Sequence, residues 1–248
     1  MHYAILGDVQ GNGEALRAVL EDIRQRKIER IVCLGNVIGF GPDPVECLDL
    51  IRNSCFITIR GDHEQALLSG TDGLIPATAR LIEWAKDMIC EGSQGENRMA
   101  FVDNTLDSFS SAGISFFHGS PRSSREYLFP SDVKRNRRKL RAAFEHVDKV
   151  CFHAHTHVPG VITENPLAWR SAADLEGYYH YRKGEKSLIN VGSVGQPRDG
   201  DPRAGYIEIR KNEIFWRRVA YDVEAVIERM ERLEVFGTNY SARLRQGR

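Results

Sequence analysis

The sequence of 248 residues has no excess charge of either sign and no long apolar segment. Its 34 lysine and arginine residues balance its 34 aspartate and glutamate residues, so any attraction to nucleic acid or to an anionic membrane must be local. No apolar stretch is long enough to span a bilayer, and the strand-like run after Met1 lacks the basic and apolar regions of a signal peptide. We therefore expect a cytoplasmic protein that does not act at a membrane.

Cysteines are few, and the usual cysteine motifs are missing. The five cysteines form an odd set without C-x-x-C spacing, and most lie inside apolar runs, as small buried side chains in a reducing compartment do. The sequence also has no internal repeat and no low-complexity segment. Its glycine-rich stretch, residues 190–196, lacks the Gly-Lys-Ser/Thr of a Walker loop.

Short apolar runs alternate with amphipathic stretches in the first part of the chain. The runs at residues 2–6, 31–34 and 55–59 predict strands, and the stripes at 15–23 and 45–51 predict the helices between them. Such alternation implies parallel strands joined by right-handed crossovers. Ligands then bind in the crevice beyond the carboxyl ends of the strands.

The rest of the chain predicts further strands and three helical segments. We expect a helical excursion at 71–104 and a helix from Ser131 to about Glu145, followed after several strands by a helix that Asp222 caps. The expected strands are residues 105–109, 114–117, 149–152, 160–163, 187–191, 205–209 and 214–219, of which the last four have connections short enough for antiparallel pairing. We expect one domain over residues 1–236 and a loose tail over 237–248.

Three histidines alternate with other residues directly after the apolar run at 150–152. In an extended chain His153, His155 and His157 would point to the same side. Neutral imidazole binds zinc, manganese, iron and nickel, so this spacing suits metal ligands.

Other polar residues follow the remaining expected strands. They are Asp8 and Gln10, Asn36, Asp62 with His63, and His118. Together with the 155–157 segment, this order resembles the motif run D-x-H, G-D, G-N-H-[DE], H and G-H-T-H of calcineurin-like metallophosphoesterases. Residues 39–44, 118–121 and 190–198 resemble the small bacterial and archaeal phosphodiesterase branch of that superfamily.

The resemblance implies an α/β fold of two facing mixed β-sheets flanked by helices, with two divalent metal ions in the crevice. It implies that Asp8 and His157 hold one metal ion, that Asp62, His118 and His155 hold the other, and that Asn36 stands at the bridging position. It also implies that His63 protonates the leaving oxygen or stabilises the charge of the transition state. Two such ions would clamp a phosphoryl group and activate a water molecule for in-line attack. His153 lies outside the motif and is expected to be structural.

Three positions depart from the pattern of this family. Gln10 replaces a histidine, Asn36 replaces the bridging aspartate, and Asp62 replaces an asparagine. A neutral amide is a poor bridge between two cations, so we expect one tight metal site at Asp62 and a weak or absent one, where Gln10 is at most a weak ligand. Whether one or two ions bind, and whether they are Mn, Fe, Zn or Ni, stays open.

The resulting hypothesis is a metal-dependent phosphoesterase that acts on a phosphomonoester or phosphodiester, either a small molecule or a nucleotide. Arg198 is a candidate for binding a substrate phosphate. The alternative is a catalytically impaired family member that binds a nucleotide, RNA or a protein through the same crevice. The basic run at 134–141 favours a solvated helix face over a nucleic-acid surface, since no aromatic residues are interleaved with it. The sequence contains no indication of the oligomeric state.

Overall fold

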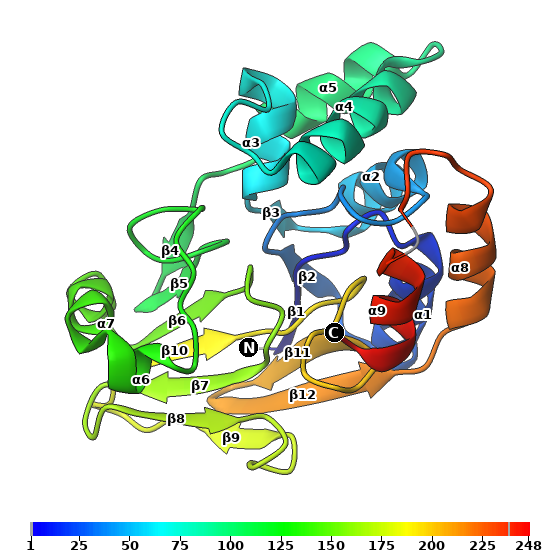
Figure 1. The fold of residues 1–248 in the computed structure, drawn as a ribbon. Coiled ribbons are helices and arrows are strands. Elements are labelled where there is room, and N and C mark those ends of the chain that lie inside the picture. Colours follow the sequence, from blue (N-terminus) through cyan, green and yellow to red (C-terminus); the bar gives the residue numbers. More distant parts are fainter. Residues whose placement is uncertain (1, 238) are drawn as a thin grey trace.

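Two six-stranded sheets pack face to face in the computed structural model, which describes residues 2–237 and 239–248 (Figure 1). The first sheet has the order β3 (Ile57–Thr58), β2 (Arg30–Cys33), β1 (His2–Leu6), β11 (Ala204–Arg210), β12 (Glu213–Val219), β9 (Tyr178–His180). The second has the order β4 (Phe109–Ser111), β5 (Ile114–Phe116), β6 (Val150–His153), β10 (Ser187–Asn190), β7 (Gly160–Thr163), β8 (Ala168–Ser171). Both sheets are mixed, which confirms the predicted fold class.

Helices cover the outer faces of the sheets. They are α1 (Gly13–Gln25), α2 (Pro44–Ser54), α3 (Asp62–Ser69), α4 (Pro76–Cys90), α5 (Gly95–Asp103), α6 (Asp132–Arg135), α7 (Arg137–Phe144), α8 (Val223–Glu231) and α9 (Asn239–Gln246). Among the described residues, no helix combines the length and the apolar character needed to cross a bilayer.

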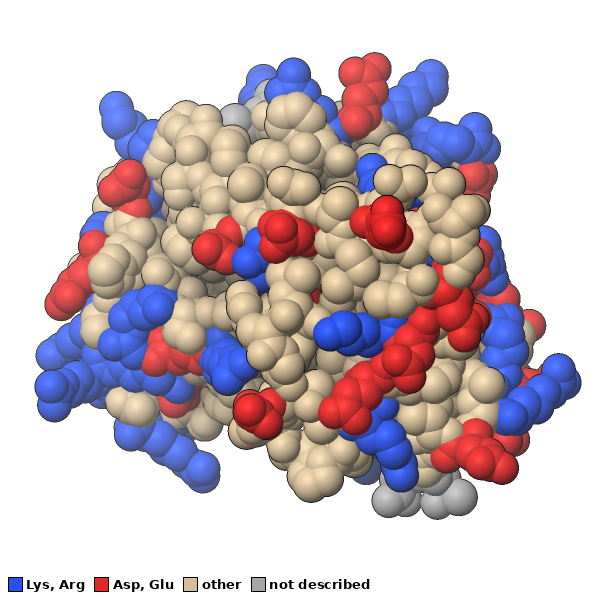
Figure 2. All heavy atoms as spheres, turned by 90° about the horizontal axis from the view of Figure 1, so that it is seen from above, with Lys and Arg blue, Asp and Glu red and all other residues tan. Residues whose placement is uncertain are grey.

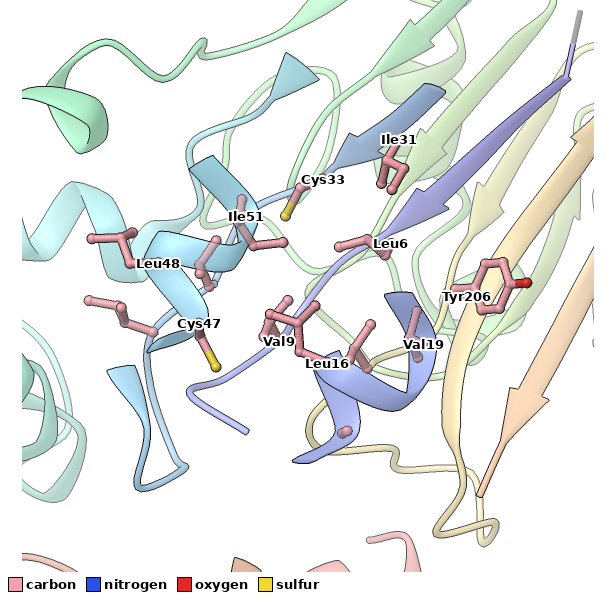
Figure 3. Packing of buried hydrophobic residues seen from close by; sticks show 14 of the residues in the cluster. Leu6, Val9, Leu16, Val19, Ile31, Cys33, Cys47, Leu48, Ile51 and Tyr206 are labelled. Atoms are coloured by element: carbon pink, nitrogen blue, oxygen red, sulfur yellow. The ribbon is translucent and has the colours of Figure 1, made fainter. Parts of the chain in front are cut away.

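The hydrophobic core forms two main layers. Between the sheets, Ile5, Phe152 and Ile207 are fully buried together with their neighbours. Outside the first sheet, Leu6 and Leu16 lie on the side of α2, and Val19 of α1 lies toward Tyr206 of β11 (Figure 3). Asn12 caps α1 by accepting a hydrogen bond from the Ala15 backbone N–H at 3.1 Å. Burying one such aliphatic side chain contributes about 1.5–3 kcal/mol, so these layers hold the strand ends rigidly.

Parallel pairing brings the chemically interesting strand ends to one edge. β1 pairs in parallel with β2 and β2 with β3, while β5, β6 and β10 pair in parallel in the second sheet. The carboxyl ends of β1, β2 and β3 therefore lie beside one another, and so do those of β5 and β6.

Several element predictions were wrong. The helix expected from Ser131 to Glu145 is broken at Asn136, whose backbone leaves the helical region at φ −145° and whose side chain caps α7. The strand expected at 105–109 is largely absent, since Leu106 forms only an isolated bridge with Ile59. β8 and β9 were not predicted.

The tail was expected to be loose, but residues 239–246 form α9. Its side chain Leu244 is 5% exposed and packs with Val226, Ile227 and Met230 of α8. The apolar spacing of Tyr240 and Leu244 was the available signal, and it was too short to distinguish from chance. Met1 and Thr238, which the predictions also covered, lie outside the described residues.

A buried carboxylate on β11 predicts how the stability of the fold responds to acid. Glu208 is fully buried, and its carboxylate accepts hydrogen bonds from His2 at 2.8 Å and from Arg217 at 2.6 Å. Burial raises its pKa, but the hydrogen bonds of His2, Arg217 and Arg210 together lower the pKa from 4.5 to about 2. A lowered carboxylate pKa stabilises the folded state fully above pH 4.5, and this contribution is lost as the pH falls toward 2.

We expect Glu208→Gln to lower the free energy of unfolding by about 2 kcal/mol at pH 7. The difference from the wild type should shrink as the pH falls from 4.5 to 2, which urea unfolding at a series of pH values would measure. Glu29→Gln is the control, because exposed Glu29 forms no ion pair with any described residue. A constant difference between Glu208→Gln and wild type over this range would contradict the prediction.

Candidate metal centre

Residues with left-handed backbone conformation determine the direction of the side chains that follow β1, β2 and β6. Asp8 has φ 50°, Asn36 has φ 49°, and His155 and His157 have φ 66° and 61°. Non-glycine residues seldom adopt positive φ, and such residues cluster at functional sites. The extended conformation expected for 153–157 is therefore wrong, because β6 ends at His153 and the chain turns at the next histidine.

His153 lies apart from the other two histidines of this segment. It is 1% exposed and its Nδ1 is 3.3 Å from the Asn190 side-chain nitrogen. Burial and the nearby charge of His118 lower its pKa to about 4, although hydrogen bonding to the Ala154 backbone opposes this effect. The ring is thus a neutral part of the interior.

Asp62, His118 and His155 converge on one point. Their ligand atoms all lie within 4.8 Å of one another. Asp62 Oδ1 is 3.1 Å from His118 Nε2 and 3.4 Å from His155 Nδ1, and these two nitrogens are 3.1 Å apart. Asp62 begins α3, whereas the histidines follow β5 and β6, so both sheets contribute to the group.

The donor set fits a divalent metal ion. Ligand atoms bound about 2.1 Å from a tetrahedral ion lie about 3.4 Å from one another, close to the separations seen here. His118 Nδ1 makes a 2.6 Å hydrogen bond to the Leu34 carbonyl oxygen, which leaves Nε2 directed at Asp62. This arrangement, in which the second ring nitrogen is fixed by a carbonyl, is usual for metal-binding histidines. His155 Nε2 is buried and has no hydrogen-bond partner among the described residues.

The electrostatics of the group are those of a cation site. Burial raises the pKa of Asp62, but the His118 hydrogen bond and the neighbouring histidine charges bring it well below its usual range. Burial lowers the pKa of His118, but Asp62 and Asp8 raise it to about 9. Burial and the charge of His118 lower the pKa of His155 to about 3. One imidazole proton thus lies between the ligand atoms, where a bound metal ion would replace it.

Asp8, Gln10 and His157 form a neighbouring cluster with a different composition. Asp8 Oδ1 is 3.3 Å from His157 Nε2, and Gln10 Nε2 is 3.4 Å from both atoms. The His157 Nδ1 bonds to the Gln196 carbonyl oxygen at 2.6 Å. The amide nitrogen of Gln10 thus faces both possible ligands, while its Oε1 is buried without a partner among the described residues.

Asn36 also presents its amide nitrogen to the centre. Its Nδ2 donates to Asp62 Oδ1 at 2.9 Å, and its Oδ1 accepts from the His63 backbone N–H at 3.0 Å. The Glu64 carboxylate accepts from the backbone N–H groups of Asn36, at 2.8 Å, and of Gly61, at 2.9 Å. These contacts fix the orientation of Asn36, with its side-chain oxygen on the His63 backbone N–H and its side-chain nitrogen on Asp62.

His63 stands beside the metal group without belonging to it. Its Nδ1 is 2.9 Å from the Ile38 carbonyl oxygen, and the edge of its ring contacts Phe40 with the centroids 5.4 Å apart. The turn that holds the ring needs Gly39, where φ is 152° and an added Cβ would overlap Gln10 Oε1 and lie 2.7 Å from His63 Nδ1.

A cavity of about 440 Å³ opens above these residues. Gln10, Asn36, Asp62, His63, His155 and His157 line its floor, and the walls come from Phe40, Gly73, Leu74, Ile75, Ala77, Thr78, Arg125, Tyr127, Arg198, Tyr240 and Arg243. Arg198 was predicted as a substrate residue. The sequence analysis missed Tyr127, whose ring stacks on that of His155 at 3.8 Å, because nothing in its loop marks it.

No residue of the basic run at 134–141 lines this cavity. It is split between α6 and α7, and Lys139 donates to the Tyr127 carbonyl oxygen at 2.9 Å. Viewed from above, basic side chains gather at the left edge of the molecule and a row of acidic side chains runs across its right side (Figure 2).

Comparisons with known proteins agree with this fold. The model of the calcineurin-like phosphoesterase superfamily domain matches residues 1–212. An uncharacterized protein of Methanocaldococcus jannaschii is 33% identical over 237 residues, which are 92% of this chain and 90% of that protein. Serine/threonine-protein phosphatase 1 of Salmonella typhimurium is 35% identical over 68 residues, 27% of this chain and 32% of that protein.

Solved structures extend these similarities over the whole chain. A metallophosphoesterase from Sphaerobacter thermophilus has a TM-score of 0.84 and 28% identity, with 100% of both chains covered. A hypothetical protein from Pyrococcus horikoshii has a TM-score of 0.77 and 18% identity, with 100% of this chain and 98% of the other covered, and shares the fold.

Proposed function

The chain belongs to the calcineurin-like phosphoesterase superfamily, and from that premise we propose that it hydrolyses a phosphate ester with one tightly held divalent metal ion. The observation that carries this proposal is the convergence of Asp62, His118 and His155 at the floor of a cavity. Three nitrogen and oxygen ligands that leave a coordination position open are typical of catalytic metal sites. The bound metal would polarise the phosphoryl group and supply an activated water molecule.

The residues around the ligands have separate roles in this proposal. Asp8 accepts a hydrogen bond from the His155 backbone N–H at 2.7 Å and so positions that ligand. His63 lines the cavity, and its Nδ1 contact with Ile38 leaves Nε2 available to give a proton to the leaving oxygen. Arg198 lines the same cavity and can bind substrate phosphate.

The contacts of two amides favour one tight metal ion over two. Gln10 directs its nitrogen at Asp8 and His157, and Asn36 directs its nitrogen at Asp62. An amide nitrogen donates hydrogen bonds and does not bind a metal ion. In this orientation both amides occupy space at the second metal position without supplying a ligand atom to it.

Asn36→Asp is expected to raise the metal content from one ion per chain to two. A carboxylate at this position would supply the charge and the second acceptor oxygen that a bridge between two ions needs. The measurement is elemental analysis after loading with Mn²⁺ and removal of the excess. A wild-type protein that already holds two ions would contradict the one-metal proposal, and a variant that holds only one would contradict the role given to Asn36.

Turnover of bis(p-nitrophenyl) phosphate in excess Mn²⁺ tests the activity itself. Hydrolysis by the wild type supports the proposal. No hydrolysis with Mn²⁺, Fe²⁺, Zn²⁺ or Ni²⁺ would favour the alternative, a family member that binds a nucleotide, RNA or a protein through the crevice. This alternative is supported by the orientation of Gln10 and Asn36, which direct amide nitrogens and not ligand oxygens at the metal positions.

A further inference from the structure

Three arginines, Arg125, Arg198 and Arg243, line the cavity above the metal centre, and the charge of Arg243 affects Arg198. Arg198 follows the glycine-rich loop after β10, and Arg243 comes from α9, which packs next to α8 (Figure 1). Helix α9 lies beyond residue 212, where the match to the superfamily domain ends. Arg243 therefore lies outside the segment that the superfamily domain matches, although the whole-chain similarity to the Sphaerobacter thermophilus structure includes it.

Neither Arg198 nor Arg243 is paired with an acidic side chain of the described residues. Within the described residues, no side-chain carboxylate lies within 4.0 Å of the Arg198 or Arg243 guanidinium. Arg198 donates from Nη2 to the Gln196 amide oxygen at 2.7 Å, while its Nε is buried and makes no hydrogen bond with a described residue. Arg243 donates from Nε to the backbone oxygen of Arg248 at 3.2 Å. By contrast, Arg245 on the same helix pairs with Glu224 at 2.6 Å.

The two positive charges act on each other. Burial lowers the pKa of Arg198, and the charge of Arg243 lowers it further, against the opposing effect of Asp8. Like charges in a partly buried cavity cost free energy unless an anion joins them. Bidentate guanidinium groups are well suited to a phosphate anion.

The arginine pair lies beside the metal centre and does not form part of it. The Arg198 backbone N–H donates to the His157 carbonyl oxygen at 3.2 Å, so its side chain begins at the edge of the ligand clusters. Tyr240, one turn before Arg243 on α9, stacks on Phe40 at 5.7 Å, and Phe40 contacts His63. The two arginines thus border the metal centre in the same cavity, but neither belongs to the group of Asp62, His118 and His155.

Resting on the proposed phosphoesterase function, we propose that Arg198 and Arg243 bind a second phosphate group of the substrate. The preferred substrates are then compounds that carry one phosphate for hydrolysis and another nearby, such as phosphoanhydrides and bisphosphates. Arg243 is a specificity-determining residue in this scheme, and α9 is part of the substrate site.

Binding of two matched probes tests this inference. Methylenediphosphonate carries two anionic groups that are not hydrolysed, and methylphosphonate carries one. Titration calorimetry with Mn²⁺-loaded protein freed of excess metal should give at least about tenfold tighter binding of the diphosphonate, as expected for an added charged hydrogen bond. Arg243→Gln should abolish most of this preference. Arg245→Gln is the matched control, because it removes an arginine of α9 that does not line the cavity.

The outcome can be separated from that of the proposed function, because binding needs no turnover. A preference that the wild type and Arg245→Gln share and that Arg243→Gln loses supports the inference, even if bis(p-nitrophenyl) phosphate is not hydrolysed. Equal binding of both probes by the wild type, or a preference that survives in Arg243→Gln, overturns it. If no metal is retained, the titrations are repeated on metal-free protein. Weaker methylphosphonate binding by Arg243→Gln than by the wild type then supports the inference, and equal binding overturns it.

Discussion

Asp62→Asn is expected to lower the affinity for the bound metal ion at least about 100-fold, since even residues that only orient metal ligands change affinity 10–100-fold. Asp62 is the single carboxylate in the group with His118 and His155. Its replacement leaves two imidazoles, and the neutral amide cannot balance the charge of a divalent ion. Elemental analysis after dialysis measures the loss, and phosphodiester turnover should fall with it.

Asp8→Asn is the matched control for this experiment. Asp8 is also buried and next to a histidine, but it lies outside the three-ligand group. An asparagine oxygen can still accept the hydrogen bond from the His155 backbone N–H. We expect Asp8→Asn to keep one metal ion per chain. Full metal content in Asp62→Asn, or loss of metal from Asp8→Asn alone, would place the tight site at the other cluster.

His63→Ala is expected to lower kcat for bis(p-nitrophenyl) phosphate by about 10²–10⁴, the usual contribution of a general acid or base. The metal content should stay unchanged, because His63 bonds to Ile38 and is not in the ligand group. The comparison of kcat with metal content separates a proton-transfer role from a structural one. Since His63 is 5% exposed, circular dichroism and thermal unfolding would check that the variant is folded.

The exposed residue His146 supplies the control for His63. It lies after α7 and does not line the cavity, so His146→Ala should match the wild type in both metal content and kcat. Turnover by His63→Ala at the wild-type rate, or a parallel loss of metal and activity, would rule out the proton-transfer role.

The strand ends could be predicted from the sequence because hydrophobic periodicity is strong there. The backbone conformation of the residues that follow the strands could not. Asp8 and Asn36 follow β1 and β2 as predicted, yet their left-handed backbone comes from tertiary packing. The orientation of the Asn36 amide depends on the contacts of Asp62 and His63, which belong to a later part of the chain. Whether an amide presents oxygen or nitrogen to a metal site thus cannot be deduced from residue type.

Parts of the cavity wall were beyond prediction for a similar reason. Tyr127 and Arg243 lie in segments with weak periodicity, and only the folded chain brings them to His155 and Arg198. The segment expected to be a loose tail forms α9, because its side chains Tyr240 and Leu244 pack against the apolar residues of α8. Short segments take their structure from such tertiary contacts more than from local propensity.

The ligands of the proposed metal ion come from both halves of the β-sandwich. Asp62 follows the first sheet, whereas His118 and His155 follow strands of the second. A bound ion is then a non-covalent crosslink between the two sheets, which closes a loop from residue 62 to residue 155. Because the unfolded chain does not hold its ligands together, an ion present at 100 times its dissociation constant would add about 2.7 kcal/mol to the free energy of unfolding. The same three side chains would then both hold the catalytic metal ion and stabilise the packing of the two sheets.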